Sequence, residues 1–181
     1  MISLAWNCQG LGAPGKIQFL QDVTRYEQPK CMFLCETITS RRKMEELCVK
    51  LKFEGLLTVE PQGRSGGIAL LWKDAEDVNL MSMSKNHIDV SIKVEGKDPW
   101  RLTGIYGEPI RAQRHKTWDL LRHLARDANL PWYLIGDFNN VTSQQDKRGG
   151  HSYPNWLVEG FNDYLRDAEL QDLEITGHQF T

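Results

Sequence analysis

The sequence predicts an α/β fold in which a mixed sheet, or two sheets, is covered by helices. Apolar runs of strand length alternate along the chain with segments whose apolar residues recur at helical spacing. Some of these runs are continuous, as in buried parallel strands, whereas residues 88–94 alternate between apolar and polar side chains, as in a half-solvated antiparallel strand. Helices interspersed with strands of both kinds favour such a layered fold.

The elements follow one another without a linker, repeat or low-complexity segment. The expected strands are residues 2–6, 31–35, 67–72, 88–94, 100–106 and 132–136. The expected helices lie around residues 19–26, 44–51, 118–125 and 157–165. Phe19, Leu20, Val23 and Tyr26 mark the apolar spacing of the first helix, which Pro29 is expected to close. A length of 181 residues suits one domain, 1–181.

Composition narrows the class of protein. Lys and Arg number 22 against 24 Asp and Glu, so no basic excess indicates a nucleic-acid binder. A local basic groove or a metal ion can still meet phosphates in a chain of balanced charge. The four cysteines form no C-x-x-C pair, which argues against a zinc site or a disulfide framework.

The sequence is also expected to belong to a soluble, intracellular protein with no membrane partner. Its N-terminus lacks the basic and apolar regions of a signal peptide. No apolar run approaches the length needed to span a bilayer.

Polar side chains stand at the carboxyl ends of four expected strands. They are Asn7, Glu36, Tyr106 and Asp137, and Asn139 follows two residues later. Ligands of α/β folds gather beyond the carboxyl ends of strands, so these ends are expected to form one pocket. Two carboxylates with amides and a phenol favour Mg²⁺ or Mn²⁺ over zinc and suit phosphate chemistry.

Each of these residues also has a purely structural interpretation. A lone acidic residue after a strand, such as Glu36, is more often a turn or a helix cap than a ligand. Asn7 is compatible with the start of the turn at residues 10–12, and Tyr106 with an ordinary strand tyrosine. The prediction of a site therefore rests on the joint pattern, in which Gly-Asp-Phe-Asn around Asp137 is the strongest part.

Several arginines are candidate contacts for a nucleic-acid backbone. Arg64 lies in a glycine-rich segment that reads either as a phosphate cradle or, more simply, as a turn before a strand. Arg111 and Arg114 belong to a basic cluster that suits a solvated helix face or a phosphate contact equally. Arg148 lies in an expected loop. No histidine is a convincing catalytic residue, and no Gly-x-Ser-x-Gly sequence indicates a serine hydrolase.

The order of five short segments resembles a known family. The segments are Trp6–Gly12, Phe33–Thr37, Gly66–Trp72, Tyr106–Pro109 and Gly136–Asn139. They look like the endonuclease/exonuclease/phosphatase family, which includes DNase I and the apurinic/apyrimidinic endonucleases. The pattern is most similar to the endonuclease domain of plant non-LTR (LINE-type) retrotransposons. The resemblance covers essentially the whole chain.

The resemblance implies a four-layer α/β sandwich, with two mixed sheets flanked by helices. It also implies that the protein hydrolyses phosphodiester bonds of DNA, or of RNA, with Mg²⁺ or Mn²⁺. Carried over by position, Glu36 would bind the metal with help from Asn7, and Tyr106 would contact the scissile phosphate. Asp137 would position or activate the attacking water, and Asn139 would stabilise the transition state.

The sequence departs from the family pattern at its end. Family members finish with a Ser-Asp-His segment, and nothing after Asp172 fits it. We therefore expect a domain incomplete at its C-terminus, without the catalytic histidine and the last strands of one sheet. An exposed sheet edge would invite self-association. The alternatives are a catalytically inactive, transposon-derived remnant, a nucleic-acid-binding module, and a phosphodiesterase of lipid headgroups, for which no headgroup loop is identifiable.

Overall fold

A computed structural model of the chain describes residues 2–63, 65–73, 77–126, 129–146, 149 and 152–173. The chain divides into two compact units. The first comprises Met1–Tyr106 and Leu130–Asp137, and the second comprises Gly107–Asn129 and Phe138–Thr181. Each unit is described by itself.

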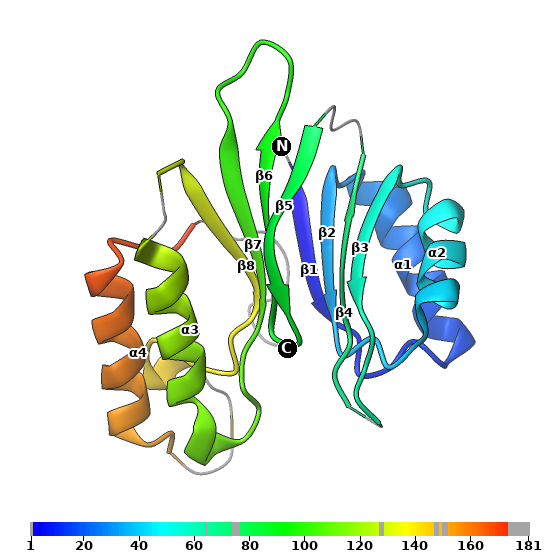
Figure 1. Cartoon of the computed structure of the whole chain (residues 1–181). Helices are drawn as coiled ribbons and strands as arrows, with labels where there is room; N and C mark the ends of the chain where they lie inside the picture. Colours follow the sequence, from blue (N-terminus) through cyan, green and yellow to red (C-terminus); the bar gives the residue numbers. More distant parts are fainter. Residues whose placement is uncertain are drawn as a thin grey trace. The chain divides into compact units, whose positions relative to one another are not determined.

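The first sheet of the first unit has the strand order β1-β2-β4-β3 (Figure 1). Its strands are β1 (Ser3–Asn7), β2 (Cys31–Cys35), β3 (Gly55–Val59) and β4 (Ile68–Trp72). Strands β1 and β2 are parallel, whereas β4 runs antiparallel to both β2 and β3. The sheet is therefore mixed, and every residue of β2 is buried.

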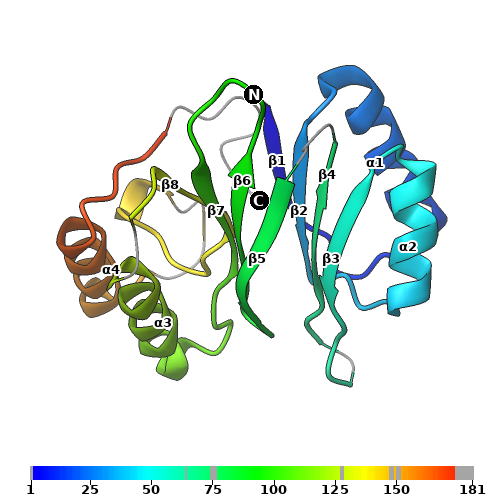
Figure 2. The same ribbon diagram turned by 45° about the horizontal axis from the view of Figure 1, so that its top comes forward.

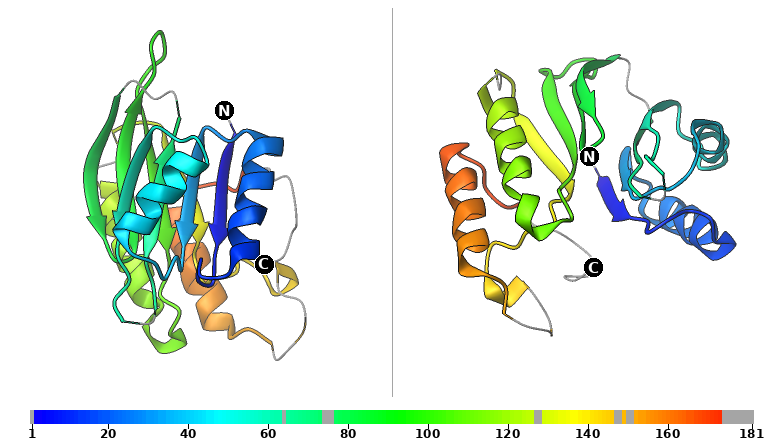
Figure 3. Two further views of the ribbon diagram at one scale, coloured as in Figure 1. Left: turned by 90° about the vertical axis from the view of Figure 1, so that its right-hand side faces the viewer. Right: turned by 60° about the horizontal axis from the view of Figure 1, so that its bottom comes forward.

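Two helices cover one face of this sheet, as Figures 2 and 3 show. They are α1 (Pro14–Glu27) and α2 (Arg41–Lys50). Proline at the start of α1 suits the first helical turn, where its missing N–H has no partner to lose. The apolar stripes of both helices pack on the sheet in a core that contains Leu20, Met44, Leu47, Met32, Leu34 and Leu71.

The expected buried face of the first helix was partly wrong. Leu20 and Thr24 are buried, but Phe19 is 49 % and Tyr26 is 86 % exposed. The helix contacts the sheet through Ile17, Leu20 and Thr24, a stripe spaced by three and four residues. Phe19 lies beside that stripe, where its ring packs against Trp6 at 5.1 Å between centroids.

The second sheet, also in the first unit, has the order β5-β6-β7-β8. Its strands are β5 (Asp77–Ser84), β6 (His87–Lys93), β7 (Trp100–Tyr106) and β8 (Trp132–Asp137). The pairs β5–β6 and β6–β7 are antiparallel, and β7–β8 is parallel. Two mixed sheets combined with helices confirm the predicted α/β fold class.

The two sheets pack face to face around a second apolar core. Phe33 and Leu70 from the first sheet meet Val90 and Leu102 from the second. Gly104 of β7 is required by this contact, because a Cβ there would lie 2.2 Å from the ring of Phe33. Burial of each large apolar side chain contributes roughly 1.5–3 kcal/mol, so this core fixes the sheets against each other.

The other face of the second sheet carries a buried polar cluster, contrary to the expectation of a half-solvated strand at residues 88–94. The carboxylate of Asp89 is 1 % exposed and accepts hydrogen bonds from Arg101 Nε at 2.9 Å and Arg101 Nη2 at 2.8 Å. Thr103 Oγ1 donates to the same carboxylate at 2.7 Å, and Trp132 Nε1 donates to Thr103 Oγ1 at 2.7 Å. A buried charge is tolerated when it is paired and hydrogen-bonded in this way.

The second unit contains a helix pair and two short 3₁₀ turns. They are α3 (His115–Arg126), α4 (Asn155–Asp167), η1 (Arg111–Gln113) and η2 (Gln144–Asp146). Gly160 of α4 lets the indole of Trp118 approach, because a Cβ there would lie 2.6 Å from the ring. Trp118 also packs edge-to-face against Trp156, with 6.3 Å between the ring centroids. Across the described residues of both units, no helix combines the length and apolarity that a membrane crossing requires.

Removing one partner of the buried ion pair should destabilise the fold strongly. Asp89→Ala deletes the carboxylate that accepts hydrogen bonds from Nε and Nη2 of Arg101. Loss of one member of a buried pair costs roughly 3–5 kcal/mol of unfolding free energy, which urea denaturation measures. The control is Glu45→Ala, which removes an exposed partner of Arg41 and should cost less than about 1 kcal/mol. Equal losses in the two variants would contradict this interpretation.

Candidate active site

Four predicted site residues of the first unit meet in the structure. Asn7 Nδ2 donates to Glu36 Oε1 at 3.0 Å and to Asp137 Oδ2 at 2.8 Å. The hydroxyl of Tyr106 donates to the same Glu36 oxygen at 3.0 Å. These residues end β1, follow β2, end β7 and end β8, so the site joins the carboxyl ends of strands from both sheets.

Strand register explains why these side chains meet. Parallel pairing of β7 with β8 places Tyr106 opposite Asp137, and parallel pairing of β1 with β2 places Asn7 opposite Cys35, the residue before Glu36. Gly136 is needed for this arrangement. Its φ is +139°, and a Cβ would lie 2.0 Å from the carbonyl oxygen of Ile105.

The backbone holds Glu36 in a strained conformation. Its φ is +51°, in the left-handed region that non-glycine residues seldom occupy. Gly10 N donates to Glu36 O at 2.7 Å, and the next two amides donate to the glycine pair, Thr37 N to Gly67 O at 3.1 Å and Ile38 N to Gly66 O at 3.2 Å. Gly66 and Gly67 thus support the loop of Glu36, which is consistent with the turn interpretation of that glycine-rich segment.

The turn after β1 is fixed from two sides. The Asn7 side-chain oxygen accepts the backbone N–H of Gln9 at 3.1 Å. Lys16 of α1 donates its ammonium to the carbonyls of Cys8 at 2.6 Å and Gln9 at 2.8 Å. The amide of Asn7 therefore directs its nitrogen at the two carboxylates while its oxygen is engaged by the turn.

Asn139 belongs to the second unit and is fixed there by a close backbone approach. Its φ is +52°, and its Nδ2 donates to the carbonyl of Gly107 at 2.9 Å. A Cβ at residue 107 would lie 2.1 Å from the carbonyl oxygen of Phe138, so glycine is required. The residues that directly follow Tyr106 and Asp137 in the chain are thus in contact.

The predicted basic contacts have different surroundings. Arg111 is exposed, with its guanidinium carbon 6.0 Å from the ring centroid of Tyr153. Arg114 is half-buried and donates a hydrogen bond to the hydroxyl of Tyr153. Arg64 and Arg148 lie outside the described residues. Sequence reasoning missed Tyr153, whose only signal is an aromatic residue within a loop rich in glycine, serine and proline.

Burial raises the pKa values of several thiols and of one phenol in the first unit, so these groups keep their protons. Desolvation raises the pKa of the Cys8 thiol to about 12 and that of Cys31 to about 11. The pKa values of Cys35 and Tyr106 are raised as well, mainly by burial, and for Tyr106 also by its hydrogen bond to Glu36. Tyr106 therefore remains a neutral phenol that donates hydrogen bonds at neutral pH.

The donor set suits a hard divalent cation. Glu36 and Asp137 are half-buried carboxylates, and Glu36 Oε2 accepts no hydrogen bond from the described residues. Within the described part of the chain, no three His, Cys, Asp or Glu side chains come together as a metal cage. One or two carboxylates with bound waters are the usual protein ligands of Mg²⁺, so the residues present fit that ion.

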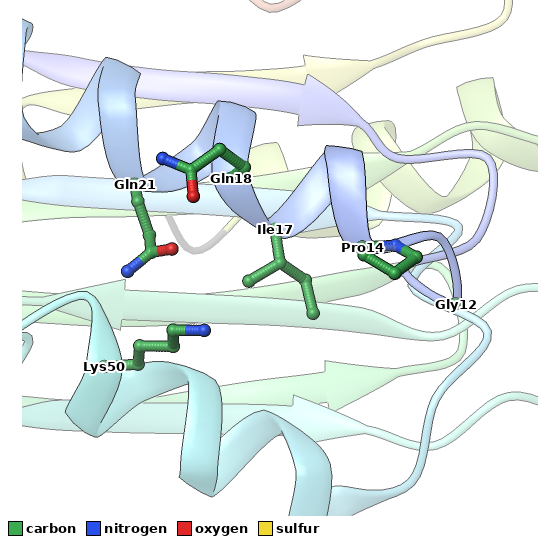
Figure 4. Close-up of a pocket in the computed structure, with 6 residues that line it drawn as sticks. All are labelled: Gly12, Pro14, Ile17, Gln18, Gln21 and Lys50. Atoms are coloured by element: carbon green, nitrogen blue, oxygen red, sulfur yellow. The ribbon is translucent and has the colours of Figure 1, made fainter.

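A surface cleft of about 310 Å³ lies elsewhere, beside α1 (Figure 4). It is lined by Gly12, Pro14, Ile17, Gln18 and Gln21 from the start of α1 and by Lys50 from α2. None of the predicted site residues lines it. The cleft offers no carboxylate, so the candidate chemistry remains at the strand ends.

The matches to known proteins agree with this fold. The chain belongs to the endonuclease/exonuclease/phosphatase family, whose sequence profile matches residues 4–180. No curated protein matches the sequence. The resemblance to that family is thereby confirmed.

Solved structures of low sequence identity share the fold. An AP endonuclease from Archaeoglobus fulgidus superposes with a TM-score of 0.67 at 15 % identity, over 92 % of this chain and 70 % of that protein. The 3'-5' exonuclease NExo from Neisseria meningitidis superposes with a TM-score of 0.66 at 16 % identity, over 92 % of this chain and 70 % of that protein. The endonuclease domain of TRAS1, a telomere-specific non-LTR retrotransposon, superposes with a TM-score of 0.62 at 15 % identity, over 92 % of this chain and 71 % of that domain.

Stability should fall as pH rises above about 9. The folded-state pKa values of Cys8 and Cys31 exceed the value near 8.5 of an unfolded cysteine, so the folded chain binds more protons there. Each such thiol removes up to about 1.4 kcal/mol of unfolding free energy per pH unit until its folded pKa is reached. Urea unfolding from pH 7 to 10.5 measures how the free energy of unfolding depends on pH. In Cys8→Ala this dependence should weaken by the amount that corresponds to about one fewer proton released on unfolding. A flat profile between pH 8.5 and 10.5 would contradict the assignment.

Proposed function

We propose that this protein is a divalent-metal-dependent phosphodiesterase that hydrolyses phosphodiester bonds of DNA. The observation that supports this proposal best is the shared amide of Asn7. It hydrogen-bonds two carboxylates that come from different sheets, with a phenol donor beside them. Membership of the endonuclease/exonuclease/phosphatase family and structural likeness to DNA-processing enzymes favour the same class of reaction.

Each residue takes a distinct role in the proposed reaction. Glu36 holds Mg²⁺ or Mn²⁺, which would neutralise phosphate charge and stabilise the leaving oxygen. Asn7 orients both carboxylates through its amide nitrogen. Asp137 accepts a hydrogen bond from the attacking water, aligns it with phosphorus and takes up its proton.

Two further residues are proposed as hydrogen-bond donors in the reaction. When substrate binds, Tyr106 turns its single hydroxyl hydrogen from Glu36 to a non-bridging oxygen of the scissile phosphate, and its raised pKa keeps that hydrogen on the phenol. Asn139 donates from its side-chain amide to the charge that develops on the phosphoryl oxygens. Such preorganised donors stabilise a transition state because their dipoles need no reorientation during the reaction.

Contacts with the nucleic-acid backbone are proposed for the exposed basic residues. Arg111 is exposed on η1, so its guanidinium is accessible to a phosphate. Arg64 and Arg148 are proposed for the same task on their sequence context alone. These contacts would strengthen binding of DNA without reading its sequence, and RNA presents the same phosphates.

Mg²⁺-dependent nicking of supercoiled plasmid tests the proposed function. We expect nicking by the 181-residue chain, its loss on chelation with EDTA, and a fall of about 10²–10⁴-fold in Asp137→Ala and Glu36→Ala, because each removes a group that acts in the transition state. Glu27→Ala removes an equal charge from an exposed helix end and serves as the control. Tight DNA binding without Mg²⁺-dependent nicking would instead identify a nucleic-acid-binding module.

We also propose that the chain associates with a second copy through the edge strand β8. Of the described strands, only β7 is hydrogen-bonded to it, and its sequence contains no lysine or proline that would discourage edge pairing. Tyr133→Lys places a charge on β8 and should weaken a dimer about tenfold in sedimentation velocity experiments. Tyr26→Lys, on the exposed side of α1, should leave it unchanged. A wild-type chain that stays monomeric at all concentrations would refute the proposal.

A further inference from the structure

Tyr153 connects two loops of the second unit through its hydroxyl group. The side chain is 7 % exposed, in the segment that precedes α4. Its oxygen accepts a hydrogen bond from the guanidinium of Arg114 and lies 3.2 Å from the carbonyl oxygen of Asn139. The amide oxygen of Asn140 lies 3.4 Å away. The single hydroxyl hydrogen therefore points into the loop that follows β8.

The ring of Tyr153 is itself held on two sides. The guanidinium carbon of Arg114 lies 5.3 Å from its ring centroid, a cation–π geometry. Gln144 pairs with its backbone, accepting from Tyr153 N at 3.0 Å and donating to Tyr153 O at 2.6 Å. Because the ring and the backbone of Tyr153 are both held, its hydroxyl group is a fixed hydrogen-bond donor to the loop that contains Asn139 and Asn140.

Asn139 needs an external constraint of this kind. Its φ of +52° lies in the left-handed region, which non-glycine residues seldom occupy and which surrounding contacts must therefore hold. Its side chain is tied to Gly107 and its carbonyl lies at the hydroxyl of Tyr153. The residue is thus held at both its side chain and its backbone.

We infer that Tyr153 is a positioning residue, which, braced by Arg114, holds the loop that presents Asn139. The inference rests on the proposed function, because Asn139 is there the donor to the phosphoryl oxygens. A displacement of about 1 Å in such a donor costs up to about 10²-fold in rate. Arg114 acts through Tyr153 in this arrangement, whereas the exposed Arg111 remains a contact for phosphate.

The variant Tyr153→Phe removes the hydroxyl group and keeps the ring. We expect its kcat for plasmid nicking to fall by about tenfold with KM unchanged, because Asn139 is misplaced in the transition state while binding is retained. Hydrogen–deuterium exchange of the peptide that spans residues 138–146 should become at least about fivefold faster. Tyr26→Phe, which removes a hydroxyl group from a side chain that is 86 % exposed on α1, is the matched control and should alter neither kcat nor exchange in that peptide.

The two readouts separate this inference from the function on which it rests. Unchanged exchange in Tyr153→Phe would overturn the inference, and faster exchange with unchanged kcat would reduce Tyr153 to a structural residue and overturn it as well. A folded wild-type chain that does not nick contradicts the proposed function alone. The exchange measurement then still decides whether the hydroxyl of Tyr153 holds the loop of Asn139.

Discussion

The amide nitrogen of Asn7 is the group on which the candidate site depends. Two carboxylates that approach the same point repel each other, and a donor between them offsets that repulsion. Here a neutral amide reaches Glu36 and Asp137 at 3.0 and 2.8 Å. Because Glu36 follows a strand of the first sheet and Asp137 ends a strand of the second, this contact also depends on how the two sheets pack.

Two of the candidate site residues have unfavourable backbone conformations, which the surrounding loops stabilise. Glu36 and Asn139 both have left-handed φ values, +51° and +52°, which cost roughly 1–3 kcal/mol each. For Glu36, the backbone hydrogen bonds to Gly10, Gly66 and Gly67 hold the loop on both sides. The glycines that look like a phosphate cradle in the sequence therefore serve the protein's own backbone, and they do so next to its central carboxylate.

The sequence allowed prediction of those features that depend on local patterns. The apolar runs predicted as strands at 31–35, 67–72 and 132–136 correspond to β2, β4 and β8, because each run is long enough for a buried strand and too short for a helix. Strands β3 and β5 were not predicted. The first, Gly55–Val59, starts with glycine and is only partly buried along its whole length. The second, Asp77–Ser84, has a register shift and three exposed apolar residues, so no regular alternation marks it.

Properties set by partners distant in the sequence were beyond a local pattern. Residues 88–94 were expected to form a half-solvated strand because apolar and polar residues alternate there, but Arg101 and Thr103 of the neighbouring strand make burial of Asp89 tolerable. The convergence of Asn7, Glu36, Tyr106 and Asp137 was predictable, since polar residues at strand ends share one edge. Tyr153 was not, because its role depends on Arg114, 39 residues away.

The chain is constrained both where β7 and β8 end and in the residues that directly follow them. Parallel pairing sets Tyr106 opposite Asp137 at the end of β7 and β8. One residue further, the backbones of Gly107 and Phe138 approach so closely that residue 107 must be glycine. The side chain of Asn139 then closes the contact on the carbonyl of Gly107. In each unit a residue without a Cβ, Gly136 or Gly107, allows a close backbone approach, so the Gly-Asp-Phe-Asn segment is constrained on both sides of its aspartate.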